Sequence, residues 1–264
     1  MKKIALQFSI LILLFFACWY VLSQIDWVTL FDVKQFTQTT EEKLGDLIWE
    51  VQDLSGKEIN DKALINPVDS ILTRICKANE LDRNRIKVHL IKNEEINAFA
   101  LPNNHLIINS GLINYCENPE ELSGVLSHEI AHMELNHIMK KLTQEIGLSA
   151  LLSVTKGKDI KVLKEIAGTL SSSAYSRKLE KEADIKGVDY LLKAHIHPKY
   201  LADFLFRLSS STSAANKYLS WINTHPDSEE RAVYLIKYGS NTKMDEKSLL
   251  TESTWNRLKE AGKE

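Results

Sequence analysis

The segment His128-Glu129-Ile-Ala-His132 combines metal-binding and acid–base side chains at a spacing that supports hydrolytic chemistry. We predict that it lies on a helix that begins at Pro119, with Asn118 as the N-cap. The two histidines then lie on the same face of the helix, where both rings can bind one metal ion. Glu129 lies about 100° further around the helix, within reach of a water bound to that ion. This is the H-E-x-x-H arrangement of zinc hydrolases, so the segment predicts one Zn²⁺ ion per chain, with Glu129 as the general base.

The motif supplies only two of the three protein ligands that a catalytic zinc ion needs, because the fourth position is kept for water. An extended form, H-E-x-x-H-x-x-G-x-x-H, would supply a third histidine. Leu135 and Ile138 stand at its glycine and final histidine positions, which excludes that form. His137 falls one residue short, and we expect it to point elsewhere on a helix that continues toward Leu142. The third ligand must therefore come from another part of the chain.

Two acidic residues on a later predicted helix could complete the site. Glu180 and Asp184 are four residues apart and share a helix face, whereas Glu182 points away from that face. A carboxylate pair in such a charged stretch is otherwise typical of a solvent-exposed face. The small residues Ala183 and Gly187 favour close packing against another helix. This is also the nearest downstream helix with a carboxylate able to complete the site.

Strand patterns precede the H-E-x-x-H helix. Residues 86–91 alternate and are rich in β-branched side chains, and His89 lies on their polar face, where we expect solvent exposure. Residues 97–101 and 105–109 are expected to form two further strands around a tight turn at 102–104. An exposed edge of this small sheet could hold an extended peptide over the metal, through Asn97, Ala98, Phe99 and Ala100. The alternative is a hairpin that only packs on the helix.

The remaining pattern is mainly helical, which makes the predicted fold class α+β. Apolar residues recur at helical spacing in residues 67–79 and 160–170, and residues 201–208 form an apolar helical run. We also expect helices in a stretch ending near 155 and in residues 175–193 and 229–238, with a short amphipathic stretch near Trp255. His195 and His197 flank a turn closed by Pro198, so we interpret them as turn and surface residues.

An apolar run from Ile4 to Leu22 begins the chain after Lys2 and Lys3. As a helix its 19 residues span roughly 28 Å, about the hydrocarbon thickness of a bilayer. The two preceding lysines favour a cytoplasmic N-terminus, and therefore a catalytic domain outside the cytoplasm, on the periplasmic side of the inner membrane. A signal peptide is one alternative. A lipoprotein anchored through Cys18 is another.

Composition limits the class of protein and its partners. The 264-residue chain has a formal net charge of −2 and no basic stripe, which argues against nucleic acid as a partner. Cys76 and Cys116 could form a disulfide or remain buried thiols, and without a C-x-x-C pair cysteine-bound zinc is excluded. We predict four regions, which are an anchor (1–25), a spacer (26–66), a catalytic domain (67–240) and a tail (241–264).

Four linked motifs together resemble a known family of peptidases. Their order and spacing over roughly residues 67–238 are similar to the gluzincin zinc endopeptidases of the HtpX, BepA and Oma type, the group that includes the CAAX prenyl protease. The motifs are Asn97-Ala98-Phe99-Ala100-Leu101-Pro102, His128 to His132, Ser176-Arg177 with Glu180 to Asp184, and Thr224-His225-Pro226 followed by Arg231. The match implies a zincin-like catalytic domain, with the small sheet packed on the H-E-x-x-H helix and one membrane helix before it.

The resemblance also implies roles for individual residues. The zinc ligands would be His128, His132 and Glu180, and Asp184 would steady a ligating histidine. His225 would approach the zinc from the far side, where it would either stabilise the transition state or occupy the metal in a resting, plugged form. Arg231 would support that loop or the substrate.

The implied activity is that of a zinc metalloendopeptidase. Its polypeptide substrates would be unfolded or misassembled envelope proteins, which is a role in protein quality control. The single apolar run differs from the multi-span family members and argues against prenyl processing. The alternative is a membrane-tethered zinc-binding chaperone or scaffold with a plugged, mostly inactive site. A purely structural zinc is disfavoured because Glu129 would then have no task.

Overall fold

The structure is a computed structural model that divides into two compact units, residues 1–42 and residues 43–264. It describes residues 7, 12–16, 19–20, 33–51, 57–157, 159–210, 220–239 and 248–261. Cys18 and most of the predicted membrane segment, residues 4–22, lie outside the described residues. Within the part that is described, no helix combines the length and apolarity needed to cross a bilayer.

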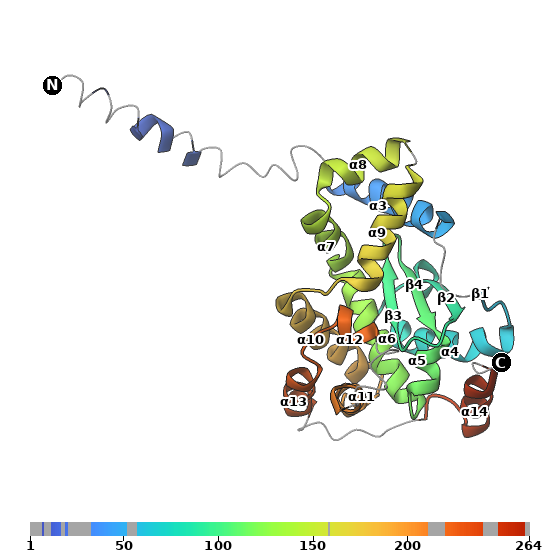
Figure 1. The fold of residues 1–264 in the computed structure, drawn as a ribbon. Helices are drawn as coiled ribbons and strands as arrows, with labels where there is room; N and C mark the ends of the chain where they lie inside the picture. Colours follow the sequence, from blue (N-terminus) through green and yellow to red (C-terminus); the bar gives the residue numbers. More distant parts are fainter. Residues whose placement is uncertain are drawn as a thin grey trace. The chain divides into compact units, whose positions relative to one another are not determined.

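The second unit is mostly helical and contains one small sheet, in agreement with the predicted α+β class (Figure 1). The predicted helices near 155, 160–170 and 201–208 are confirmed as α8 (Leu148–Gly157), α9 (Ile160–Ser172) and α11 (Lys199–Ser210). In chain order the elements are α3 (Val33–Val51), which crosses the boundary between the units, β1 (Lys57–Glu58), α4 (Lys62–Ala78), η1 (Arg83–Arg85), β2 (Lys87–Lys92), β3 (Ala98–Leu101), β4 (His105–Asn109), α5 (Ser110–Tyr115), α6 (Pro119–Glu134), α7 (His137–Glu145), α8 (Leu148–Gly157), α9 (Ile160–Ser172), α10 (Arg177–Lys193), α11 (Lys199–Ser210), α12 (Ser220–Thr224), α13 (Ser228–Gly239) and α14 (Glu252–Ala261).

The four-stranded sheet has the order β1-β2-β4-β3, with β2 and β4 parallel and the other pairs antiparallel. The β3–β4 hairpin turns at Asn103 and Asn104, whose φ angles of 61° and 56° are left-handed. Asparagine tolerates this conformation, which confirms the predicted turn. The hairpin places β3 at the edge of the sheet, where it contacts α6 and α9.

Helix α6 carries the H-E-x-x-H motif and is buried along most of its length. Asn118 Oδ1 caps it by accepting a hydrogen bond from the Glu121 amide at 2.9 Å, and Pro119 is its first residue, as predicted. The expectation that this helix continues toward Leu142 is wrong. It ends at Glu134 because Asn136 adopts a left-handed conformation (φ 55°, ψ 32°), and α7 then starts in a new direction.

Residues of the predicted spacer and of the predicted tail contribute to the core. Leu44 and Ile48 in α3 are fully buried, although they fall in the region assigned to a spacer. In the tail, Trp255 is buried and its indole Nε1 donates to the Glu117 carbonyl at 3.1 Å. Cys76 and Cys116 are free buried thiols, so the disulfide alternative is wrong.

The expected solvent exposure of His89 is also wrong. Its side chain is only 12% exposed because Trp49 of α3 stacks on the ring, with the centroids 3.6 Å apart. A second histidine, His105 on the neighbouring strand, lies 3.0 Å from it between ring nitrogens. Trp49 therefore covers the part of the polar strand face where His89 lies.

Candidate metal centre

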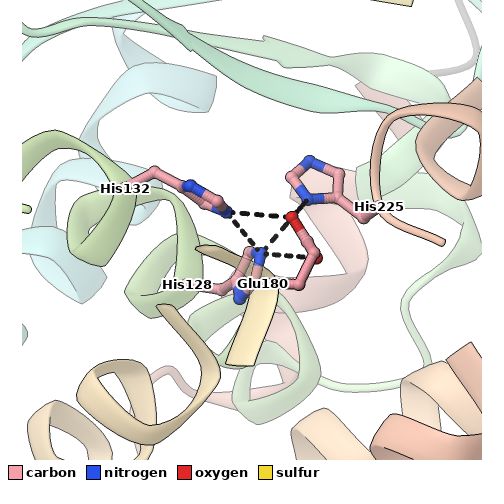
Figure 2. Close-up of side chains that lie close together, drawn as sticks. All are labelled: His128, His132, Glu180 and His225. Carbon is pink, nitrogen blue, oxygen red and sulfur yellow. Dashed lines mark hydrogen bonds and ion pairs between the residues drawn. The ribbon is translucent and has the colours of Figure 1, made fainter. Parts of the chain in front are cut away.

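Four side chains converge between α6, α10 and the end of α12, as Figure 2 shows. His128 Nε2 lies 3.0 Å from His132 Nε2 and 3.2 Å from His225 Nδ1. Glu180 Oε1 lies 3.3 Å from His132 Nε2 and 3.0 Å from His225 Nδ1, and its Oε2 lies 3.6 Å from His128 Nε2. All four side chains are at most 2% exposed. The potential ligand atoms form one buried cluster within 4.8 Å of one another.

This donor set fits a zinc ion. Imidazole nitrogens and carboxylate oxygens bind zinc at roughly 2.0–2.2 Å, which places neighbouring tetrahedral ligands about 3.3–3.5 Å apart. The observed separations bracket that value. The Glu129 carboxylate is 1% exposed, and its two oxygens make no hydrogen bond, although Oε1 lies 3.3 Å from His225 Nε2. A buried carboxylate with free acceptor capacity beside the cluster has the position that a general base requires.

A carboxylate and an arginine fix the outer side of His128. Asp184 Oδ1 lies 3.0 Å from His128 Nδ1, on the ring edge opposite the cluster. Arg231 donates to both Asp184 oxygens, from Nε at 2.8 Å and from Nη2 at 2.7 Å, and Tyr234 donates to the same carboxylate. The guanidinium also lies 2.6 Å from Glu180 Oε2 and donates to the His225 carbonyl at 3.4 Å. Arg231 thus connects two helices with the loop that carries His225.

The electrostatic environment shifts the pKa values of the three carboxylates in different directions. Burial, together with the charge of Glu180, raises the pKa of Glu129 well above its usual value. Burial would raise the pKa of Glu180 as well, but His225 and Arg231 hold it well below its usual value. Burial opposes ionisation of Asp184 too, and Arg231 overcomes it and lowers that pKa. The cluster therefore pairs two carboxylates that stay ionised with one that readily accepts a proton.

His132 is supported by a residue that was expected to point away. Because the chain turns at Asn136, His137 folds back and its Nδ1 lies 3.0 Å from His132 Nδ1. His137 Nε2 in turn lies 3.3 Å from Glu182 Oε2. Burial, and secondarily Lys140, lowers the pKa of His137 and keeps the ring neutral. Asparagine directly after an apolar helix is a common stop signal, so this turn could have been predicted.

Aromatic rings that were not predicted cover two of the histidines. Tyr175 stacks on His132 with centroids 4.1 Å apart, and Lys141 lies 4.3 Å above the Tyr175 ring. Trp221 stacks on His225 at 4.3 Å. Trp221 precedes His225 by four residues and its carbonyl accepts the His225 amide hydrogen bond at 2.9 Å, so this helical spacing was the available signal.

The predicted substrate strand is at the sheet edge but is not exposed. Asn97 pairs with β4 through its carbonyl, so the backbone groups of Ala98 and Ala100 point away from β4. The side chains of Asn97, Ala98, Phe99 and Ala100 are at most 7% exposed. The Trp221 amide donates to the Ile96 carbonyl at 3.1 Å, so α12 lies at the start of this edge. In this conformation the edge is covered.

Site and fold together define the class of H-E-x-x-H metallopeptidases. The sequence profile of peptidase family M48 matches residues 64–238, and the chain belongs to that family. The chain is 25% identical over 206 residues to the beta-barrel assembly-enhancing protease of Escherichia coli, covering 72% of this chain and 42% of that protein. It is 26% identical over 172 residues to the mitochondrial metalloendopeptidase OMA1 of Schizosaccharomyces pombe (62% and 50%), and 27% identical over 198 residues to the metalloprotease LoiP of Escherichia coli (70% and 77%). The predicted resemblance is confirmed, and the chain spans less than two thirds of the first two relatives.

Proposed function

We propose that this protein is a zinc-dependent metalloendopeptidase in which His128, His132 and Glu180 hold the ion. The observation that supports this most directly is the buried cluster of ligand atoms beside the buried Glu129 carboxylate, whose oxygens accept no hydrogen bond. The family supports a metalloprotease, and the distances within the cluster suit zinc.

The chemistry assigns separate tasks to the chain's own residues. When bound, zinc lowers the pKa of a coordinated water to about 7 and polarises a carbonyl. Glu129 accepts the proton of the attacking water and returns it to the departing amine, a task that its raised pKa suits. Asp184 and Arg231 hold His128 and Glu180 in place. His225, once it has withdrawn from Glu180, donates to the developing oxyanion, an interaction worth about 3–4 kcal/mol in comparable sites.

A second candidate function follows from the closure of the site. His225 Nδ1 occupies the position of a fourth ligand, and all four residues are buried. Helix α9 contacts β3, and Ala98 and Ala100 are at most 1% exposed, so a substrate strand cannot pair with β3 until this cover moves. The protein is then either a latent peptidase that requires activation or a membrane-tethered, zinc-bound chaperone or scaffold that seldom cleaves.

We also propose the substrates and the location. Unfolded or misassembled envelope proteins offer the extended backbone that an uncovered β3 edge would bind. One relative is named a beta-barrel assembly-enhancing protease, which supports a similar role here. The 19-residue apolar run near the N-terminus supports a membrane anchor with the catalytic domain on the periplasmic side.

Cleavage of unfolded casein by the full chain in detergent tests this proposal. We expect fragments to form, to disappear with a chelator and to return when zinc is added. His225→Ala separates the two roles of this ring, because loss of its hydrogen bond to the oxyanion should slow cleavage, whereas faster cleavage would show that the ring chiefly plugs a latent site. If neither form cleaves while zinc remains bound, the scaffold function is correct instead.

A further inference from the structure

We propose that His137 and Glu182 position His132 for metal binding by deciding which of its ring nitrogens carries the proton. Neither residue belongs to the ligand set. The inference rests on the proposed function, because it takes His132 Nε2 as a metal ligand.

The geometry forms a chain of three side chains. Glu182 Oε2 lies 3.3 Å from His137 Nε2, and His137 Nδ1 lies 3.0 Å from His132 Nδ1. The opposite nitrogen, His132 Nε2, faces the cluster at 3.3 Å from Glu180 Oε1. The two imidazoles are fully buried, so solvent does not reach the contact between them.

The chemistry of Glu182 determines the direction of this chain. An ionised carboxylate can only accept hydrogen bonds, so His137 Nε2 must carry the proton. A neutral imidazole has a single N–H, and His137 Nδ1 is therefore an acceptor. His132 Nδ1 must then donate to it, which leaves the lone pair on Nε2. That lone pair points at the cluster, as a zinc ligand requires.

A comparison with the other histidine supports a role beyond packing. His128 is held with its proton on Nδ1 without an intervening residue, because Asp184 contacts this nitrogen directly at 3.0 Å. Asp184 is fully buried and is held by Arg231. Glu182 is 39% exposed and its nearest described cation, Lys178, is 3.9 Å away. The outer nitrogen of each metal-facing histidine is therefore linked to a carboxylate. His128 contacts Asp184 directly, and His132 is linked to Glu182 through His137.

The backbone break at Asn136 makes the contact possible. On an uninterrupted helix a residue five positions after His132 would lie about 140° around the axis, facing away from it. The left-handed conformation of Asn136 ends α6 and returns His137 toward the ring. His137 Nδ1 faces the outer nitrogen of His132, so His137 is a positioning residue and not a fourth ligand.

Zinc affinity of the full chain, measured by competition with a fluorescent chelator, tests this assignment. His137→Leu should weaken zinc binding by about 10–100-fold, the usual cost of removing such a support. His137→Asn should bind within a few-fold of the wild type, because the Asn Oδ1 can accept the same hydrogen bond. Glu182→Ala, in α10, should weaken binding by a smaller factor. Glu134→Ala removes an exposed acid at the end of α6, and as the control it should have no effect.

A second measurement reports the proton position directly. Long-range ¹H–¹⁵N spectra of the zinc-free protein should show His132 protonated on Nδ1 in the wild type and in His137→Asn, and a mixture of tautomers in His137→Leu and Glu182→Ala. If His137→Leu does not fold, the Asn and Glu182 variants supply the same comparison.

Unchanged affinity and tautomer in folded His137→Leu or Glu182→Ala would overturn the inference, as would equal losses in the Leu and Asn variants. If the wild type binds zinc and His132→Ala does not, the proposed metal site is correct whatever the outcome for His137 and Glu182. A wild type that binds no zinc would instead contradict the proposed function.

Discussion

Gly187 of α10 packs directly on the backbone of His128, since a Cβ at Gly187 would lie 3.3 Å from both the His128 Cα and its amide nitrogen. Any side chain at this position would require the two helices to move apart by a few tenths of an ångström. Because α10 lies so close to α6, Glu180, about two turns before Gly187, reaches the two histidines. The third proposed ligand therefore depends on a glycine that carries no functional group.

Replacing Gly187 with valine should separate the two helices. Overpacking of this kind typically costs 1–3 kcal/mol, and we expect zinc affinity to fall with stability. Gly168→Ala in α9 is the control, because a Cβ there meets no atom within 4 Å and should stabilise the helix by about 0.5–1 kcal/mol. Urea unfolding and zinc titration measure both effects, and equal stability of Gly187→Val and wild type would refute the packing argument.

Glu129→Gln should retain zinc and lose cleavage. The amide preserves the shape of the side chain but cannot take a proton from water, so the rate should fall by at least about 10²-fold. Zinc content per chain and the rate of casein cleavage are the measurements. Cleavage that persists in this variant would remove Glu129 from the mechanism.

Arg231→Met should be among the most damaging substitutions outside the proposed ligands. It leaves Asp184 and Glu180 as buried charges without their cation, a loss that typically costs 3–5 kcal/mol. Arg177→Met removes a pair with Asp227 whose arginine is 78% exposed, and should cost less than about 1 kcal/mol. Chemical denaturation of both variants compares the two pairs, and similar losses would show that burial of the Arg231 pairs is not decisive.

Acid should destabilise the fold through His105. Burial lowers the pKa of this histidine to about 4, although Asp46 opposes the shift. Above the unfolded value of about 6.5 the residue contributes no pH dependence, whereas between 6.5 and 4 the unfolded chain binds a proton that the folded chain does not. Stability should therefore fall as the pH drops through this window and level off below it.

His105→Gln should remove that part of the pH dependence. The difference in unfolding free energy between wild type and variant should change by about 3 kcal/mol from pH 7.5 to pH 3.5. Urea unfolding of zinc-free protein measures it without a contribution from metal release. Stability curves that stay parallel over this range would contradict the assignment.

The parts of the site that follow helical periodicity could be predicted from sequence. His128 and His132, like Glu180 and Asp184, lie four residues apart on uninterrupted helices, so their shared faces follow from helix geometry. The β3–β4 turn was equally local, because two consecutive asparagines specify it.

The remaining relationships could not be read from spacing. His137 was misplaced because one left-handed residue, Asn136, redirects the chain. His89 was expected to be exposed because strand alternation identifies a polar face but does not reveal that Trp49, forty residues earlier, covers it. The contact between Arg231 and Asp184, 47 residues apart, depends on how α13 packs against α10.

Anomalous X-ray scattering from crystals of the zinc-loaded protein, recorded above and below the zinc edge, tests the central claim most directly. We predict one zinc peak per chain, at about 2.0–2.2 Å from His128 Nε2, His132 Nε2 and a Glu180 oxygen. A peak held by other residues, or no peak at this cluster, would contradict the proposed metallopeptidase site.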